Sequence, residues 1–226
     1  MSEPTYPYQP GFLQVYYGPM SGGKTLKIIQ KLRKAEHIGG VESIIFQPRG
    51  RTRTPGRIET RLEQDGTKLY MPAFDIPYDD PWKAEAMIED RHKIVVFDEV
   101  PFFSPDICGL IFKLLKKNID VAVSGLNLDF RGEPFLVTNY LLAHSIYPIP
   151  CMPVCTYKTK NGGGVEVNCG KLAERTQRKF NGVYSSFTED IIMIETNLPP
   201  GTVVEYYPVC VAHHIVPGSP VNKPYS

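Results

Sequence analysis

The sequence predicts an α/β fold in which a mostly parallel β-sheet is flanked by helices and followed by a smaller, metal-binding domain. Three observations lead to this prediction. Short apolar runs alternate with amphipathic segments over the first 150 residues, a pattern typical of parallel βαβ units. A glycine-rich turn joins the first apolar run to the first amphipathic segment. Beyond residue 150, glycine and proline become frequent, and four of the five cysteines lie there.

Each element follows from a local pattern. Apolar runs that end at Gly, Pro or acidic residues predict buried strands at residues 12–17, 43–48, 93–100 and 120–126. Helical periodicity, with a double-Gly stop after the first segment and a Ser-Pro-Asp start before the last, predicts helices at residues 24–40, 82–91 and 104–118. Residues 49–72 are rich in Arg, Thr and Gly, which favours a loop or a loose hairpin.

Composition divides the chain and limits its function. We expect a lead-in at residues 1–11, the α/β domain at 12–148, the metal-binding domain at 149–216 and a tail at 217–226. The net charge is +1 and the basic residues are dispersed, so no basic face for nucleic acid is predicted. No apolar run could span a bilayer, and no signal peptide is recognisable. We therefore expect a cytoplasmic protein without nucleic-acid or membrane partners, in which cysteines favour a metal site or free thiols over disulfides.

The turn after the first strand matches the phosphate-binding pattern G-x-x-x-x-G-K-[ST] in full. Gly18 and Gly23 let the backbone curl, so that successive N–H groups point at phosphate oxygens. Lys24 would neutralise the phosphates, and the Thr25 hydroxyl could ligate magnesium. A glycine-rich turn without a ligand is the alternative, but the strand before it and the helix after it favour a P-loop of the NTPase type. The predicted nucleotide contacts are Gly18, Pro19, Met20, Ser21, Gly22, Gly23, Lys24 and Thr25.

An acidic pair closes the third predicted strand. Asp98 would hold magnesium, directly or through water, as in the second phosphate-binding motif of such proteins. Glu99 would point in a different direction and could face an acceptor as a general base. Two solvated acids at a strand end are the alternative, which the upstream phosphate loop makes less favoured.

Four blocks of the sequence resemble the zinc-containing (type II) thymidine kinases. They are YYGPMSGGKT (16–25), FDEVPFFSPD (97–106), GLNLDFRGEPF (125–135), and CGKLAERTQR (169–178) with YYPVCVAHH (206–214). The resemblance runs from about residue 13 to 214. It implies an ATP- and Mg²⁺-dependent transfer of phosphate to the 5′-hydroxyl of thymidine, for nucleotide salvage and DNA precursor supply. Glu99 would be the general base, and the protein a homo-oligomer, commonly a tetramer in this family.

The resemblance also implies a nucleoside site. Its expected base-pocket residues are Met20, Leu126, Phe130 and Phe135, of which the two phenylalanines could stack on a base. The second domain would form a lasso that closes over the base, largely through backbone contacts. The expected lasso contacts are Thr176, Ile191 and Tyr206.

The chain departs from the family pattern at several positions. Ser21-Gly22 stand where a bulky residue and then Ser are usual, and Pro101 replaces a residue that is often Gln. The family's Asp-x-Arg-Tyr segment has no clear counterpart, and Glu195-Thr196 replace small residues in the lasso. Two alternatives therefore stay open: a kinase for another or a modified pyrimidine deoxynucleoside, and a non-catalytic nucleotide-binding protein.

The metal site is predicted from cysteine and histidine spacing together with the resemblance. Cys210-x2-His213 has knuckle spacing, and Cys169 is fixed by the family block that follows it. For the fourth ligand, spacing favours Cys151 with Cys155. The family has two residues between its first cysteines, whereas thirteen residues, 156–168, separate Cys155 from Cys169 here, which means an insertion of eleven. This insertion alternates around Asn-Gly-Gly-Gly like a β-hairpin, whose ends would meet.

We therefore predict a structural Zn²⁺ site made of Cys155, Cys169, Cys210 and His213, because four protein ligands leave no open position. Cys151 is the rival for Cys155, and His214 could replace its neighbour. Scattered free thiols are the remaining alternative.

Overall fold

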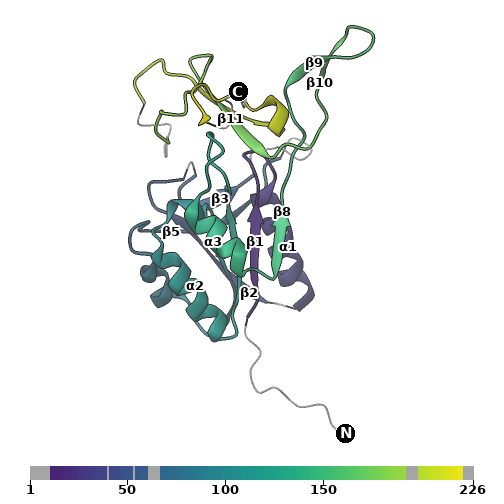
Figure 1. Cartoon of the computed structure of the whole chain (residues 1–226). Coiled ribbons are helices and arrows are strands. Elements are labelled where there is room, and N and C mark those ends of the chain that lie inside the picture. Colours follow the sequence, from purple (N-terminus) through teal and green to yellow (C-terminus); the bar gives the residue numbers. More distant parts are fainter. Residues whose placement is uncertain (1–10, 40, 53, 61–66, 192–197, 221–226) are drawn as a thin grey trace.

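The computed structural model describes residues 11–39, 41–52, 54–60, 67–191 and 198–220 (Figure 1). A six-stranded sheet forms its centre, and every neighbouring pair in that sheet is parallel. The strand order is β5 (Phe74–Ile76), β2 (Glu42–Pro48), β6 (His92–Phe97), β7 (Asp120–Gly125), β1 (Leu13–Tyr17) and β8 (Tyr147–Pro150). The predicted parallel α/β architecture is thus confirmed.

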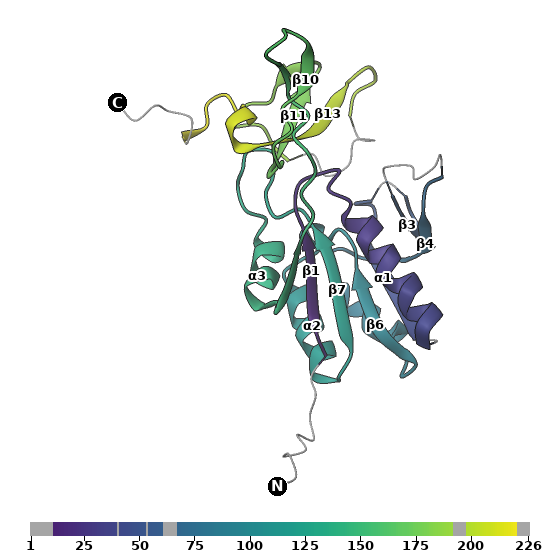
Figure 2. The same ribbon diagram turned by 90° about the vertical axis from the view of Figure 1, so that its right-hand side faces the viewer.

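Helices cover both faces of the sheet. Helix α1 (Lys24–Gly39) packs on one face, whereas α2 (Asp106–Lys116), α3 (Leu136–His144) and the 3₁₀ helix η1 (Pro81–Met87) pack on the other (Figure 2). The strands between them bury both of their faces. In β6, Ile94 and Val96 face the α1 side, and Val95 and Phe97 face the α2 side. Continuous β-branched and aromatic runs are what such doubly covered strands require.

A second, smaller domain lies at the carboxyl end of the sheet. Its antiparallel strands are β11 (Arg175–Phe180), β12 (Val183–Tyr184) and β13 (Val204–Val209), and the 3₁₀ helix η4 (Val211–His213) follows. The predicted hairpin in the insertion is formed by β9 (Lys158–Lys160) and β10 (Glu166–Asn168), and it projects away from the body (Figure 1). The division expected between residues 148 and 149 falls within β8, which belongs to the central sheet.

Two expectations for local structure differ from the structure, and the loop or loose hairpin expected at 49–72 is confirmed as a hairpin. The helix expected at 82–91 is the 3₁₀ helix η1, and it ends early because the backbone of Ile88 is already extended. The region 49–72 contains a short antiparallel hairpin of β3 (Arg57–Glu59) and β4 (Tyr70–Pro72). The strand predicted to end at residue 100 ends at Phe97, and the short 3₁₀ helix η2 (Val100–Phe102) follows it.

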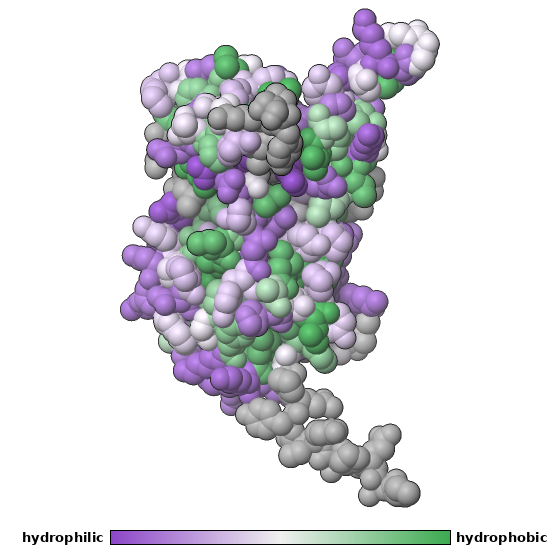
Figure 3. All heavy atoms as spheres, viewed as in Figure 1, coloured by the Kyte–Doolittle hydropathy of each residue, from purple (hydrophilic) through white to green (hydrophobic). Residues whose placement is uncertain are grey.

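Sequence patterns did not indicate β5, β8 or α3. Strand β5 has only three residues, too few for a periodicity. Strand β8 contains Pro148 and Pro150, which argue against a strand, but an edge strand bonds to one neighbour only and tolerates them. Figure 3 shows apolar residues at the surface over α3 and β8. Leu136 on α3 and Ile146, next to β8, are exposed. Within the described ranges, no helix is long and apolar enough to cross a membrane.

Candidate functional site

The loop of residues 18–25 links β1 to α1 at the carboxyl edge of the sheet. Gly18 and Gly23 have φ angles of +138° and +76°, and Ser21 has a left-handed φ of +62°. These angles curl the chain around the Lys24 side chain. Its ammonium group donates hydrogen bonds to the carbonyl oxygens of Gly18 and Pro19, at 3.0 and 2.8 Å. The backbone thus has the curled form that the phosphate-binding pattern predicts, with a lysine held inside it.

The loop is pressed against the chain that leaves β8. A Cβ atom added to Gly22 would lie 2.0 Å from the Cys151 carbonyl oxygen, and one added to Gly18 would lie 2.4 Å from the same atom. This close approach explains why glycine stands at position 22, where the resemblance leads one to expect Ser. It also places Cys151 beneath the loop, buried in the core on the α1 side and apart from the other candidate metal ligands.

Asp98 follows β6 directly and is buried. Its backbone amide donates to the Phe46 carbonyl oxygen at 2.9 Å, and its carboxylate accepts a hydrogen bond from the Ser124 hydroxyl on β7. Burial, together with the neighbouring Glu99 charge, raises the pKa of Asp98 to about 7. The Lys24 ammonium acts in the opposite direction on the same pKa, so the two groups lie within electrostatic reach. A buried carboxylate of this kind gains from a bound cation.

Glu99 does not simply continue the strand alternation. Its φ and ψ are 51° and 43°, a left-handed conformation that is uncommon for a residue other than glycine. The chain therefore turns sharply after Asp98, and the half-buried Glu99 begins η2. Non-glycine residues with such backbone angles are concentrated at functional sites, because the surrounding structure must hold them in place. The direction of Glu99 is set by this turn rather than by the strand period.

Pro101 packs into the same turn. A Cβ atom on Gly125, at the end of β7, would lie 2.5 Å from the Cδ atom of Pro101. The proline is buried, so its ring fills the space at the strand end and no amide side chain is present there. The departure at this position is therefore accommodated by packing against Gly125.

Three of the expected base-pocket residues follow β7, and the fourth, Met20, lies in the phosphate loop after β1. Phe130 is buried, whereas Leu126, Phe135 and Met20 are partly exposed. The Phe135 ring meets Phe102 of η2 edge to face, with ring centres 5.9 Å apart. The segment after the acidic pair and the segment after β7 are thus joined by an aromatic contact, as expected for adjacent carboxyl strand ends.

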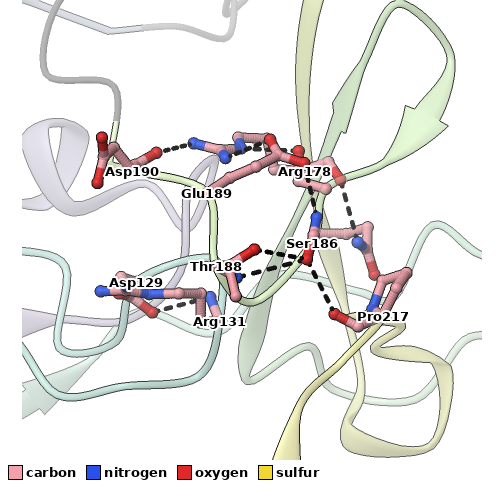
Figure 4. A network of polar contacts seen from close by, with 10 residues as sticks. Asp129, Arg131, Arg178, Ser186, Thr188, Glu189, Asp190 and Pro217 are labelled. Carbon is pink, nitrogen blue, oxygen red and sulfur yellow. Dashed lines mark hydrogen bonds and ion pairs between the residues drawn. The ribbon is translucent and has the colours of Figure 1, made fainter.

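Arg178 on β11 is a residue that sequence reasoning did not single out. It is 1% exposed, and its guanidinium carbon lies 3.5 Å from the centre of the Phe130 ring. Its nitrogens donate to the Ser185 hydroxyl, the Glu189 carboxylate and the Asp190 carbonyl oxygen at 2.9, 2.8 and 2.7 Å (Figure 4). Arg178 lies two residues after Thr176 on the same strand, so both side chains are on one face. This spacing was the signal in the sequence that could have identified Arg178.

A second polar cluster fixes the turn that carries Phe130. The buried Asp129 carboxylate accepts from the backbone amides of Arg131 and Glu133 at 2.8 and 3.0 Å, and it pairs with the Arg131 guanidinium (Figure 4). The Nε2 atom of His214 lies 2.8 Å from the Phe130 carbonyl oxygen. His214 is therefore engaged with this turn and is not one of the clustered metal ligands.

The expected lasso residues lie in the second domain. Thr176 is buried on β11, and its hydroxyl accepts a hydrogen bond from the Met20 backbone amide at 3.1 Å. Tyr206 lies on β13 opposite Arg178, and Ile191 ends the described segment 67–191. The substitutions at Glu195-Thr196 lie outside the described residues.

Four ligand side chains gather in the second domain, within 4.8 Å of one another. They are Cys155, Cys169, Cys210 and His213. The Nδ1 atom of the histidine lies 3.4 Å from the Cys210 sulfur and 3.6 Å from the Cys155 sulfur. The Cys169 amide donates to the Tyr157 carbonyl oxygen at 2.8 Å, which closes the inserted hairpin and returns the two cysteines to each other. Three thiols and one imidazole at such distances form a donor set that suits tetrahedral zinc.

Comparison with known proteins places the chain in a family. A family model described as thymidine kinase matches residues 11–214. The thymidine kinase of Coprothermobacter proteolyticus is 31% identical over 212 residues, which cover 93% of each chain. Those of Ureaplasma urealyticum serovar 10 and Thermococcus kodakarensis are each 29% identical, over 95% and 92% of this chain and 86% and 95% of their own lengths. The chain therefore belongs to the thymidine kinase family.

Proposed function

We propose that the protein is a thymidine kinase that transfers the γ-phosphate of ATP to the 5′-hydroxyl of thymidine. The observation that carries this proposal is the meeting of three features at one edge of the sheet. The curled loop 18–25, the acidic pair after β6 and the aromatic segment after β7 all leave carboxyl strand ends. Open parallel sheets bind their ligands at that edge, and family membership identifies the ligands as those of a thymidine kinase.

The loop would bind the phosphates of ATP. Its backbone amides and Lys24 supply positive charge for the β- and γ-phosphates. Thr25 and Asp98 would hold Mg²⁺, which would neutralise part of the phosphate charge. The buried Asp98 carboxylate fits this role, because burial disfavours its charged form and a bound cation would stabilise it.

Glu99 would act as the general base on the 5′-hydroxyl. Its side chain is half-buried and its backbone is turned out of the strand direction, while its backbone amide donates to the Ser124 hydroxyl at 3.4 Å. A carboxylate placed there can accept the hydroxyl proton as the oxygen attacks the γ-phosphorus.

The nucleoside would lie between the aromatic segment and the second domain. Leu126, Phe130, Phe135 and Met20 would wall the base, and Thr176, Ile191 and Tyr206 would close over it. Zinc on Cys155, Cys169, Cys210 and His213 would be structural, because all four positions are filled by the protein and nothing is left for substrate. We also propose a cytoplasmic homo-oligomer, a tetramer by resemblance to the family, which light scattering during size-exclusion chromatography can check.

The proposed function is tested by a phosphorylation assay on a panel of deoxynucleosides with Mg²⁺-ATP. Thymidine should be the preferred acceptor. Glu99→Gln should lose most turnover while retaining ATP binding, because only proton transfer is removed. Preference for another pyrimidine nucleoside would leave the kinase but contradict the assigned pocket. ATP binding without turnover on any nucleoside would make the chain a nucleotide-binding protein rather than an enzyme.

A further inference from the structure

One hydrogen bond joins the phosphate loop to the second domain. The Met20 amide donates to the Thr176 hydroxyl over 3.1 Å, between residues 156 positions apart in the chain. Thr176 is 3% exposed, so water has little access to the bond. Met20 is expected to contact both ATP and the base, and its backbone is therefore a point at which the two ligand sites meet.

The strand that carries Thr176 also holds the wall of the nucleoside site. Thr176 and Arg178 are two residues apart on β11 and so share one face. Through this face, β11 contacts the phosphate loop at Met20 and the Phe130 ring at Arg178. Arg178 also binds the Asp190 carbonyl oxygen, next to Ile191 of the expected lasso (Figure 4). A ligand held between Phe130 and the residues next to Asp190 will therefore also act on β11.

The loop needs such external support. Ser21, adjacent to Met20, has a left-handed φ of +62°, which L-residues other than Asn and Asp adopt at a cost. A bond that fixes Met20 from the second domain favours this curled form over others. The expected contacts of Thr176 with the base are largely through its backbone, so its hydroxyl can hold Met20 at the same time.

We propose that the Thr176 hydroxyl couples the two substrate sites, so that a bound nucleoside tightens the binding of ATP through the Met20 backbone. The proposal rests on the proposed function, since it needs both ligands. A bound nucleoside would hold β11 more firmly in place, the Thr176 hydroxyl would then keep Met20 fixed for more of the time, and the loop would lose less conformational freedom when the phosphates bind. By linkage, ATP must tighten nucleoside binding by the same factor.

The test is a binding titration with a non-hydrolysable ATP analogue, in the absence and presence of saturating thymidine. In the wild type, thymidine should lower the Kd of the analogue by roughly 5-fold or more, the usual range for coupled sites. Thr176→Val keeps the β-branched shape but removes the acceptor, and it should reduce the factor to about 1–2. Thr176→Ser keeps the acceptor and is the matched control, so it should retain the coupling.

The outcomes separate this proposal from the proposed function. If both ligands bind the wild type independently, the coupling is overturned while the kinase assignment stands. If thymidine still tightens binding of the analogue in Thr176→Val, the role of the Thr176 hydroxyl is overturned. If thymidine does not bind at all, both fail.

Zinc content and thermal unfolding of each variant report folding. Should Thr176→Val fail to fold, amide hydrogen exchange in the wild type decides: the Met20 amide should be protected and more so with thymidine, and an unprotected amide refutes the bond.

Discussion

The guanidinium carbon of Arg178 lies 3.5 Å from the centre of the Phe130 ring, and both side chains are buried. A planar guanidinium can stack on a ring and still donate in its own plane, which an ammonium group cannot do. Arg178 uses this geometry to hold Phe130 on one side and the Glu189–Asp190 backbone and carboxylate on the other. The base-pocket wall and the start of the lasso segment are thereby fixed relative to each other.

Arg178→Lys should raise the KM for thymidine about tenfold and lower the free energy of unfolding by about 2 kcal/mol, because the stacking and two of the three hydrogen bonds of the guanidinium are lost. The KM for ATP should change much less. Steady-state kinetics and denaturant titration measure these effects. Arg175→Lys is the matched control and should behave like the wild type, because Arg175 lies on the same strand and donates to the exposed carbonyl oxygen of Glu174. An unchanged thymidine KM in Arg178→Lys would remove the positioning role.

Asp98 should lower the stability of the ligand-free protein at neutral and alkaline pH while being required for activity. Its pKa is raised to about 7 in the folded protein by burial and the Glu99 charge, above its ordinary value of 3.8. The folded state thus binds this proton more tightly than the unfolded chain, and stability is lost as the pH rises from about 4 to 7. Without Mg²⁺ and ATP, Asp98→Asn should therefore be more stable than the wild type at pH 8, by about 1–3 kcal/mol, yet inactive.

Thermal unfolding at pH 5 and pH 8 checks this expectation for Asp98→Asn. The stability difference from the wild type should be larger at pH 8, where the wild-type carboxylate must be charged. Equal stability differences at the two pH values would show that the folded protein does not disfavour the charged form of the Asp98 carboxylate.

Gly22→Ser should disrupt the phosphate loop, although Ser is the residue expected there from the family pattern. Its Cβ would lie 2.0 Å from the Cys151 carbonyl oxygen, so the loop or β8 must move. We expect ATP binding to weaken more than tenfold and stability to fall by about 2 kcal/mol. Calorimetric ATP titration and thermal unfolding measure both. The paired variant Ser21→Gly relieves a positive φ and should bind ATP as the wild type does. Normal ATP affinity in Gly22→Ser would contradict the close approach.

The metal cluster should contain about one zinc ion per chain, since one Cys₃His set of four ligands is present in the described structure. Cys169→Ser should abolish most zinc binding and lower the melting temperature. Cys108→Ala, buried on α2 and outside the cluster, should keep its zinc. Elemental analysis of the purified variants distinguishes the two. A folded wild-type protein without metal would refute the zinc assignment.

Local patterns predicted the parts of the fold that local physics determines. The strands β1, β2, β6 and β7 and the helices α1 and α2 carry clear periodicities, and the alternation around Asn161 marked the inserted hairpin. The same alternation indicated how Cys155 and Cys169 could meet. Strand β8 was hidden by its prolines, which are tolerated only because the strand lies at a sheet edge.

The finer geometry of the site depends on long-range contacts that no local pattern encodes. Three contacts join segments that are distant in the sequence. They are the hydrogen bond between Met20 and Thr176, the stacking of Arg178 on Phe130, and the close approach of the Cys151 carbonyl to Gly22. The left-handed turn at Glu99 is also invisible in the sequence, because glutamate seldom adopts it. These contacts are set by how the second domain and the sheet edges pack together.

The inserted hairpin keeps Cys155 and Cys169 together whatever the length of chain between them. Because the Cys169 amide binds the Tyr157 carbonyl oxygen, both ligands are placed by the base of the hairpin, and its tip at residues 161–164 is remote from them. Doubling the length of such a loop costs only about 0.6 kcal/mol in closure entropy. The tip is therefore a natural attachment point for a fluorophore, an affinity tag or a surface tether, at a distance from both cysteines.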